Sequence, residues 1–184
     1  MKNFRFLAML LLGVLLNVNL RSCSKDDNLP EKGDDKVEHP NGIPNKIPNN
    51  VIYYTTKDKI IVRLKNEDVF GGAKIVSNTY SSTKGYGTIE FASEVTAIEA
   101  KAFKSKTTLT YIVLPNSVTS IGEYAFNNCT SLTKIEVDTN NPNYSTAAQG
   151  IIRCKEDKPE LIAYPSATGD ITIPDGVTSI NSYA

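Results

Sequence analysis

The sequence predicts an α+β solenoid, built of stacked units of about 23 residues and preceded by a small β-rich N-terminal unit. Three observations predict this fold class. Residues 89–111 match residues 112–134 position by position, and the strand-like tripeptide 135–137 continues in the same register. After an interruption, the letters VTSI and YA return within residues 177–184. A matched spacing of this length is typical of repeat proteins, in which each unit packs on its neighbours.

Each unit combines a short strand with an arc of chain. In residues 111–114, apolar side chains alternate between the two sides of an extended strand. In the arc, Ser120 followed by Glu123 is a capping-box pattern, which predicts about two turns of helix. Neither element can cover its own apolar side, so stacking is required. The equivalent apolar positions are Ile89 and Ile112, Phe91 and Leu114, Val95 and Val118, Ile98 and Ile121, Ala102 and Ala125, Phe103 and Phe126, and Leu109 and Leu132.

The folded part divides into a β-rich N-terminal cap, residues 51–88, and the repeats, residues 89–184. Alternation in the cap predicts a hairpin over 51–64 and strands at 74–80 and 88–91. The repeat units are 89–111, 112–134 and 135–184, the last interrupted by a hairpin insert with strands at 150–154 and 161–164, and truncated. The expected next residue after Ala184 is Phe, which predicts a fragment of a longer repeat protein.

The first 22 residues read as a secretory signal. Lys2 and Arg5 precede an apolar run over residues 6–16, which is shorter than the about 20 residues that a membrane-spanning helix needs. The letters LRSC, residues 20–23, resemble the lipobox of bacterial lipoproteins. The resemblance implies that Cys23 is lipidated and becomes the first residue of an outer-membrane lipoprotein. The segment SKDD that follows, residues 24–27, contains one lysine and two acids and resembles short export signals to the cell surface.

Residues 23–50 are expected to form a disordered tether, because they hold many prolines and acids and no aromatic residue. The only histidine, His39, falls in this tether, so no catalytic or metal-binding role is expected for it. Loss of the signal removes three basic residues and no acid, so the mature chain is mildly acidic and binding to nucleic acid is not expected.

The second unit carries a family resemblance. LPNSVTSIGEYAFNNCTSLTKIEV, residues 114–137, resembles the leucine-rich repeat of the BspA-like class of bacterial surface proteins. The interrupted segment, its restart and the leader IYYTTKDKIIV resemble parts of the same family. The resemblance implies a surface lipoprotein that adheres to host extracellular proteins or to other cells.

A ribbon of stacked strands would present outward side chains on one concave face. By register, the candidate ligand-binding residues are Glu90, Tyr111, Val113, Lys134, Glu136 and Thr172, with Thr88 and Asp170 beside them. No catalytic motif, metal-ligand set or cofactor-binding loop is present, so an enzyme is not expected. The alternative function is a glycan-capture lipoprotein of an outer-membrane uptake system, with Tyr111, Tyr144 and Tyr164 as stacking platforms; a fragment without its own function is a third reading.

Two cysteines remain besides Cys23. Cys129 is expected as a buried thiol within the repeat, because free cysteine is among the most buried residue types. A disulfide between Cys129 and Cys154 is the alternative, since the predicted compartment permits disulfides.

Overall fold

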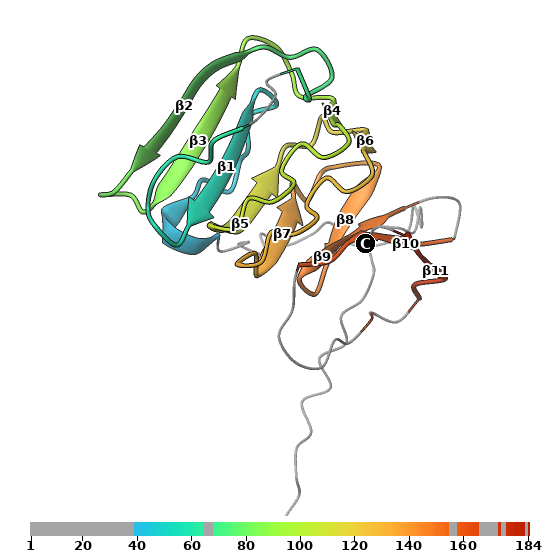
Figure 1. The fold of residues 1–184 in the computed structure, drawn as a ribbon. Helices are drawn as coiled ribbons and strands as arrows, with labels where there is room; N and C mark the ends of the chain where they lie inside the picture. The colour runs from blue at the N-terminus through green and yellow to red at the C-terminus, as the bar shows by residue number, and fades with distance from the viewer. Residues whose placement is uncertain (1–38, 65–67, 155–157, 166–172, 174–175, 183) are drawn as a thin grey trace, which may run out of the picture.

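The computed structural model describes residues 39–64, 68–154, 158–165, 173, 176–182 and 184. The predicted signal, the lipidation site Cys23, and the candidate residues Asp170 and Thr172 lie outside the described residues. The described strands form three sheets (Figure 1). The largest has the order β2-β3-β1-β5-β7, a second has the order β11-β10-β9-β8, and β4 pairs with β6 alone.

The large sheet holds five strands with bounds β1 Val51–Thr56, β2 Ile75–Ser81, β3 Tyr86–Phe91, β5 Leu109–Leu114 and β7 Lys134–Val137. The two-stranded sheet joins β4 Ala97–Ile98 and β6 Ser120–Ile121. The four-stranded sheet holds β8 Tyr144–Ala147, β9 Gly150–Arg153, β10 Glu160–Ala163 and β11 Ser179–Ile180.

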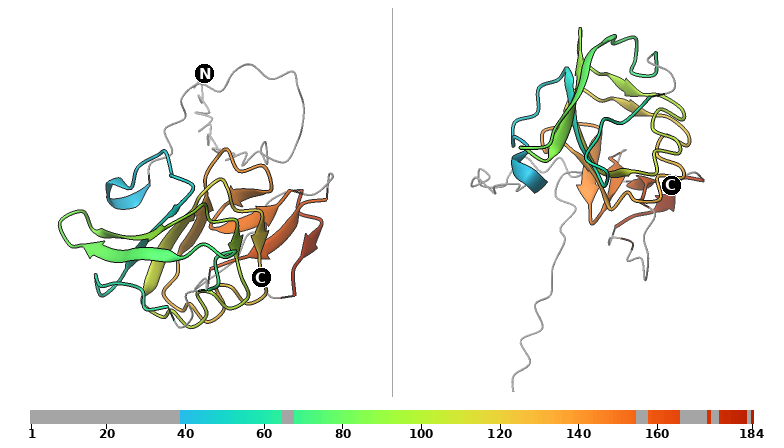
Figure 2. Two further views of the ribbon diagram at one scale, coloured as in Figure 1. Left: turned by 90° about the horizontal axis from the view of Figure 1, so that it is seen from above. Right: turned by 60° about the vertical axis from the view of Figure 1, so that its left-hand side comes forward.

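The predicted 23-residue spacing is confirmed in the packing: β4 and β6 join the first unit to the second, and β5 and β7 join the second unit to the start of the third. Strands β5 and β7 run parallel, with Ile112 opposite Ile135, and β4 and β6 run parallel, with Ile98 opposite Ile121. Both pairings join residues 23 positions apart, a separation that recurs in the bond from Thr133 Oγ1 to the Thr110 carbonyl. The arcs of the two units follow one another along one side of the sheet (Figure 2).

The expected helices in the arcs are wrong, and with them the α+β class. The described helical structure is one three-residue 3-10 helix, Pro40–Gly42, and the arcs are runs of turns. Within each arc alternate N–H groups close turns of the i to i+3 type, while the N–H groups of Lys101, Phe103 and Ser105 cross to carbonyls of the next unit. A backbone that donates across units in this way cannot donate to its own residue i−4, which an α-helix requires. The capping-box residue Ser120 lies in strand β6 instead.

Left-handed backbone conformations also recur with the repeat. In the first arc Lys101 and Ser105 have φ of 63° and 59°, and in the second arc Tyr124 and Asn128 both have φ of 58°. Positive φ is uncommon outside glycine and ends a helix wherever it occurs. The two units therefore share their backbone geometry, although the side chains at these positions differ between them.

The order of strands differs from the predicted ribbon. Residues 89–91 were expected beside residues 112–114, but β1 lies between them and pairs antiparallel with both β3 and β5. Ile52 lies opposite Ile89, and Tyr54 lies opposite Ile112. Strand β1 of the N-terminal unit is therefore inserted between the strands of the first two repeat units, whereas β2 lies at the edge of the sheet. The second half of the predicted 51–64 hairpin is not a strand, and Ile60 and Ile61 in it are exposed.

The main core lies between the large sheet and the arcs. Phe103 is fully buried and stacks on Phe126, with ring centroids 5.5 Å apart and an interplanar angle of 4°. On its other side, Phe70 meets Phe103 edge to face at 5.8 Å and also contacts Phe91 at 4.9 Å. Phe70, from the loop before β2, thus fills the place that a preceding unit would give to its own phenylalanine.

Cys129 is buried beside this row of rings as predicted. Its thiol donates to the Phe103 carbonyl at 3.0 Å, and the cysteine is free, so the alternative Cys129–Cys154 disulfide is not formed. Burial raises the pKa of the Cys129 thiol above its usual value, although the Lys106 backbone N–H and charge oppose the shift.

The insert forms the predicted hairpin, and it also takes over a position in the repeat. Strands β9 and β10 pair antiparallel. Strand β10 then pairs in parallel with β11, whose flanking residues Thr178 and Asn181 donate their N–H groups to the carbonyls of Pro159 and Leu161. Thr119 and Gly122 make the same two bonds to the first unit. Strand β10 therefore occupies the arc-strand position of a third unit, and the described chain mixes stacked units with an antiparallel sheet.

The arcs of the first two units approach each other closely at Gly122, and its replacement by alanine is expected to lower the free energy of unfolding by about 1–3 kcal/mol. A Cβ there would lie 2.4 Å from the backbone nitrogen of Ala100 and 2.8 Å from the carbonyl carbon of Glu99. Because backbone atoms of one coil oppose it, the coils must separate to admit the methyl group. Urea unfolding followed by circular dichroism measures the change.

Glu99→Ala is the matched control, since Glu99 is the equivalent position of the first unit and is exposed. The control is expected to change stability by less than about 0.5 kcal/mol. Equal stability of the Gly122→Ala variant and the parent chain would contradict the close approach of the two coils.

Candidate functional site

The predicted ligand-binding residues lie on one face of the large sheet. Val113 lies opposite Glu136 and Tyr53, and Tyr111 lies opposite Lys134, so these side chains share a face by register. We call this surface the ribbon face, defined by Tyr53, Tyr86, Thr88, Glu90, Tyr111, Val113, Lys134 and Glu136.

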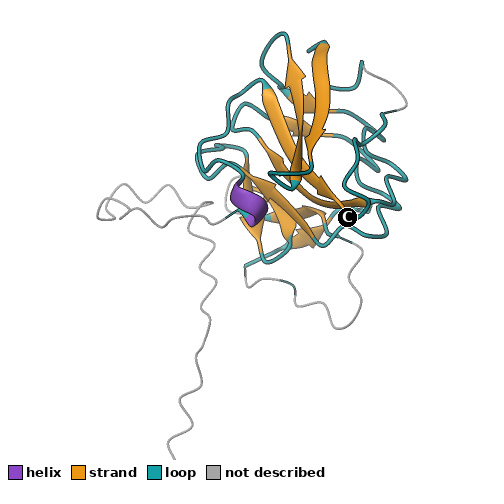
Figure 3. Cartoon of the chain, turned by 90° about the vertical axis from the view of Figure 1, so that its left-hand side faces the viewer, coloured by secondary structure: helices purple, strands orange, loops and turns teal. Residues whose placement is uncertain are grey.

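The ribbon face is covered at its centre, which corrects the expectation that its residues point to solvent. Val113 is fully buried, and Tyr111 and Glu136 are 4% and 5% exposed. The cover is the chain's own segment 39–47, which lies against the strands with the short helix Pro40–Gly42 at its start (Figure 3). We call residues 39–47 the plug.

The plug also corrects the predicted tether, whose last residues are folded. Ile43 and Ile47 are 3% and 5% exposed and form one apolar cluster with Tyr86, Tyr111 and Val113. The composition of residues 23–50 argued for disorder, but a four-residue pattern within it could have found the plug. The pattern is PNGI, PNKI and PNNV over residues 40–51, with a β-branched apolar residue at every fourth position.

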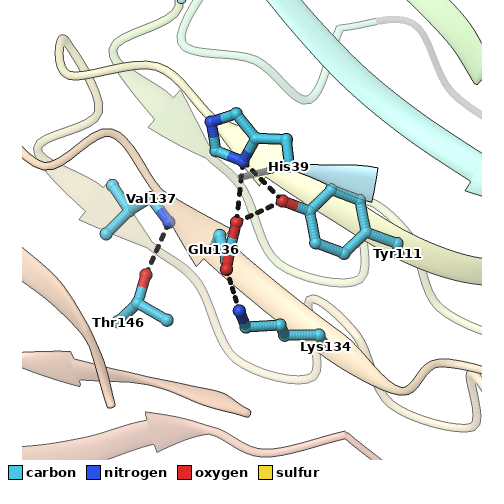
Figure 4. A network of polar contacts seen from close by, with 6 residues as sticks. All are labelled: His39, Tyr111, Lys134, Glu136, Val137 and Thr146. Atoms are coloured by element: carbon cyan, nitrogen blue, oxygen red, sulfur yellow. Dashed lines mark hydrogen bonds and ion pairs between the residues drawn. The ribbon is translucent and has the colours of Figure 1, made fainter. Parts of the chain in front are cut away.

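A polar cluster fastens the start of the plug to β5 and β7 (Figure 4). His39 donates from Nδ1 to Glu136 Oε2 at 2.9 Å, and the same nitrogen lies 2.8 Å from the Tyr111 hydroxyl. The Tyr111 hydroxyl also donates to Glu136 Oε2, and Lys134 pairs with Glu136 Oε1. The His39 and Glu136 side chains are 5% and 7% exposed, whereas Lys134 is 41% exposed. The histidine that the sequence left without a role is therefore the polar anchor of the plug.

The electrostatics of the cluster favour an ionised Glu136 and a protonated Tyr111. Burial alone would raise the pKa of Glu136, but hydrogen bonds from Lys134, Tyr111 and His39 and the charge of Lys134 outweigh it, so the pKa is lowered. Burial, the hydrogen bond to Glu136 and its negative charge together raise the pKa of Tyr111 well above its usual value. The carboxylate accepts from each of its three neighbours, so the arrangement suits anchoring.

Hydrogen bonds to β8 and to the turn that follows it hold strand β7 in place. The Val137 N–H donates to Thr146 Oγ1 of β8 at 3.0 Å (Figure 4), and the Ile135 N–H donates to the Gln149 carbonyl. These bonds pair the edge of the large sheet and fix Glu136 at the position where the plug meets it.

A groove beside the plug remains open to solvent. A shallow groove of about 370 Å³ is lined by Pro40, Thr55, Thr110, Tyr111, Thr133 and Lys134. The Thr55 and Thr110 hydroxyls are 2.6 Å apart, and Thr133 donates to the Thr110 carbonyl at 2.8 Å. We call it the threonine groove. The remaining candidate, Glu90, is exposed at the far side of the ribbon face and accepts from Ser77 Oγ at 3.1 Å.

The tyrosines considered for glycan stacking do not form exposed platforms. Tyr111 lies under the plug, and Tyr144 is 2% exposed, with its hydroxyl accepting from the Ile121 N–H at 3.0 Å. Tyr164 is partly buried and packs against Ile152 and Leu161. The described tyrosine positions therefore give no support to the glycan-capture alternative.

Metal-ligand clusters and membrane-spanning helices are absent from the described residues. Within them, no group of three or more His, Cys, Asp or Glu side chains is placed to hold a metal ion. No helix in the same part of the chain has the length and apolar character to cross a membrane.

Comparison with known proteins identifies the repeats. Residues 71–150 match the model of the BspA type leucine rich repeat region, in six copies. A solved leucine rich cell surface protein from Faecalibacterium prausnitzii A2-165 is 36% identical with a TM-score of 0.40, and the match covers 45% of this chain and 22% of that chain. This chain therefore aligns with less than a quarter of that protein's length. No curated protein matches the chain.

Proposed function

Because the chain is a BspA-like leucine-rich repeat protein, we propose that it is a surface-anchored binding protein that attaches to host extracellular proteins or to other cells. The observation that carries the proposal is the stacking of two repeat units in register, which sets the starts of β5 and β7 side by side. At that edge the threonine groove offers hydroxyl groups and the half-exposed Lys134 ammonium to a partner. We propose binding and not catalysis, since Glu136 and Tyr111 are bonded to each other and to His39 of the plug.

Anchoring is part of the proposal. Cleavage of the predicted signal before Cys23 and lipidation of that cysteine would hold the chain to the outer membrane, with the folded part outside the cell.

The binding proposal is tested by retention of partners on the immobilised chain. Matrix proteins, whole cells and glycans are each passed over the full chain lacking residues 1–22, and retention of a protein ligand is expected. Thr133→Arg fills the threonine groove and is expected to weaken retention at least tenfold. Thr119→Arg is the matched control, because Thr119 is also exposed in the second unit and also donates to a carbonyl one unit earlier. Retention of glycans alone, or equal retention by both variants, would contradict the proposal.

The anchor is tested separately in cells fed an alkyne-bearing fatty acid. The parent chain and Cys129→Ser are expected to carry the label, and Cys23→Ser is expected to lose it. A label that persists on Cys23→Ser would rule out lipidation at that residue without affecting the binding proposal.

A further inference from the structure

The plug combines a tight turn with extended residues that precede prolines. Prolines at 40, 44 and 48 alternate with the buried residues Ile43, Ile47 and Val51. Two residues that precede prolines, His39 and Ile43, have φ, ψ of −72°, 146° and −54°, 133°. These angles are close to the polyproline II region, to which a residue before proline is restricted. Between them, Pro40–Gly42 form a 3-10 turn in which Asn41 and Gly42 have φ of 59° and 72°, so the prolines restrict the residues on either side of a turn and not one extended segment.

The surface under the plug is lined with aromatic rings. Tyr53 and Tyr86 meet edge to face with centroids 5.6 Å apart, and Tyr111 closes the cluster beside Val113. This cluster is separate from the main core on the other side of the sheet. Aromatic-lined grooves are the surfaces on which proteins recognise polyproline-type peptides.

The plug is held through side chains. Its anchors are His39 on Glu136, Asn41 Nδ2 donating to the Gly85 carbonyl at 3.1 Å, and the two isoleucines. Among the described residues, no backbone N–H or carbonyl of residues 39–47 bonds to a strand of the large sheet; the backbone bond within the plug runs from Ile43 to Pro40. Such a segment can leave the sheet without breaking a strand pairing, since its opening exposes one small satellite cluster.

We propose that the ribbon face is a recognition groove for proline-punctuated peptides of a partner protein that form the same turn as the plug, and that the plug is its resident intramolecular ligand. The partner segment carries a β-branched aliphatic residue at every fourth position, proline after each, and a hydrogen-bond donor that meets Glu136. This deepens the proposed binding function, on which it rests, by naming the chemistry of the ligand. A partner competes with the plug, so its apparent affinity falls in proportion to the fraction of chains whose plug is open.

The test uses the full chain lacking residues 1–22 and a fluorescein-labelled peptide with the sequence of residues 39–51, HPNGIPNKIPNNV. The double variant Ile43→Ala, Ile47→Ala weakens the resident plug, and anisotropy is expected to show at least tenfold tighter peptide binding than for the parent. The matched control is Ile60→Ala, Ile61→Ala, which removes the same atoms from isoleucines that are 52% and 38% exposed. It is expected to bind the peptide as weakly as the parent chain does.

A second peptide with both isoleucines replaced by alanine is expected not to bind any of the chains. The inference is overturned if the plug-weakened variant keeps its β-sheet circular dichroism and binds neither peptide, or binds both alike. If the double variant loses that signal, Ile47→Ala alone is measured against the same two criteria. If peptide binding appears only when the parent chain also forms dimers, the occupant of the groove is a second copy of the chain. That result would overturn the assignment to a partner protein.

The two proposals fail separately. If the chain retains protein ligands but the plug-weakened variant does not bind the peptide, the binding function stands and this inference is wrong. A chain that retains no protein ligand but binds the peptide when the plug is weakened has a recognition groove whose partner is not among the proteins and cells screened.

Discussion

Replacement of Phe103 by alanine is expected to lower the free energy of unfolding by about 3–5 kcal/mol. Phe103 is fully buried between Phe126, stacked at 5.5 Å, and Phe70, edge to face at 5.8 Å. The ring therefore joins the second unit, the first unit and the loop that caps them. Because rigid turns surround it, the space it leaves cannot close fully, and the cost includes the cavity as well as the lost burial. Urea unfolding followed by circular dichroism measures the change.

Val76→Ala is the control for this prediction. Val76 is 67% exposed in strand β2, and its truncation is expected to change stability by less than about 0.5 kcal/mol. An unchanged slope of the unfolding transition would show that the variant still unfolds as one unit. A loss below about 1 kcal/mol for Phe103→Ala would mean that the two units do not share a core.

The spacing of the repeat could be read from the sequence because it is carried by local, recurring apolar positions. Each pair such as Phe103 and Phe126 must lie in the same place in its unit, whatever the path of the arc between strands. The turns of the arc could not be read in this way. Ser120 and Glu123 satisfy a local helix-start pattern. The competing backbone bonds instead join residues 22 positions apart in neighbouring units, as from the Phe103 N–H to the Ala125 carbonyl.

The insertion of β1 between β3 and β5 was not predictable from alternation. Alternation places Ile52 and Tyr54 on one face of a strand, but it does not say which strands lie on either side of it. The same limit applies to the ribbon face. Register placed Tyr111, Val113 and Glu136 on one face, but their burial depends on a segment more than 60 residues earlier in the chain.

The plug was missed because average composition masked a short regular pattern. Prolines and asparagines dominate residues 40–50, so the few apolar residues among them do not stand out. Two isoleucines at a spacing of four are enough to attach the segment, because proline has already removed much of the conformational entropy that ordering would cost. His39 then gained a role that neither its neighbours in sequence nor any motif indicated.

Replacement of Glu136 by glutamine is expected to lower the free energy of unfolding by about 3 kcal/mol at pH 7. The substituted amide would keep the shape of the side chain, but it carries no charge to pair with Lys134 and offers one carbonyl oxygen where the carboxylate has two. His39 and Tyr111 would compete for that oxygen in a site where little water enters. Glu90→Gln is the matched control, because Glu90 lies on the same sheet face but is exposed; less than about 0.5 kcal/mol is expected for it.

The effect of Glu136 is expected to depend on pH in one direction. Because its pKa in the folded chain is lowered from the usual 4.5, the carboxylate contributes its full stabilisation above about pH 4.5 and loses it as the pH falls through the folded value. The stability difference between the parent chain and Glu136→Gln should therefore be constant from pH 8 to about pH 5 and shrink below it. Urea unfolding of both chains at matched pH measures this difference, which belongs to Glu136 together with its contacts to His39, Tyr111 and Lys134. A difference that stays constant down to about pH 3 would show that Lys134, Tyr111 and His39 do not lower the pKa of Glu136 in the folded chain.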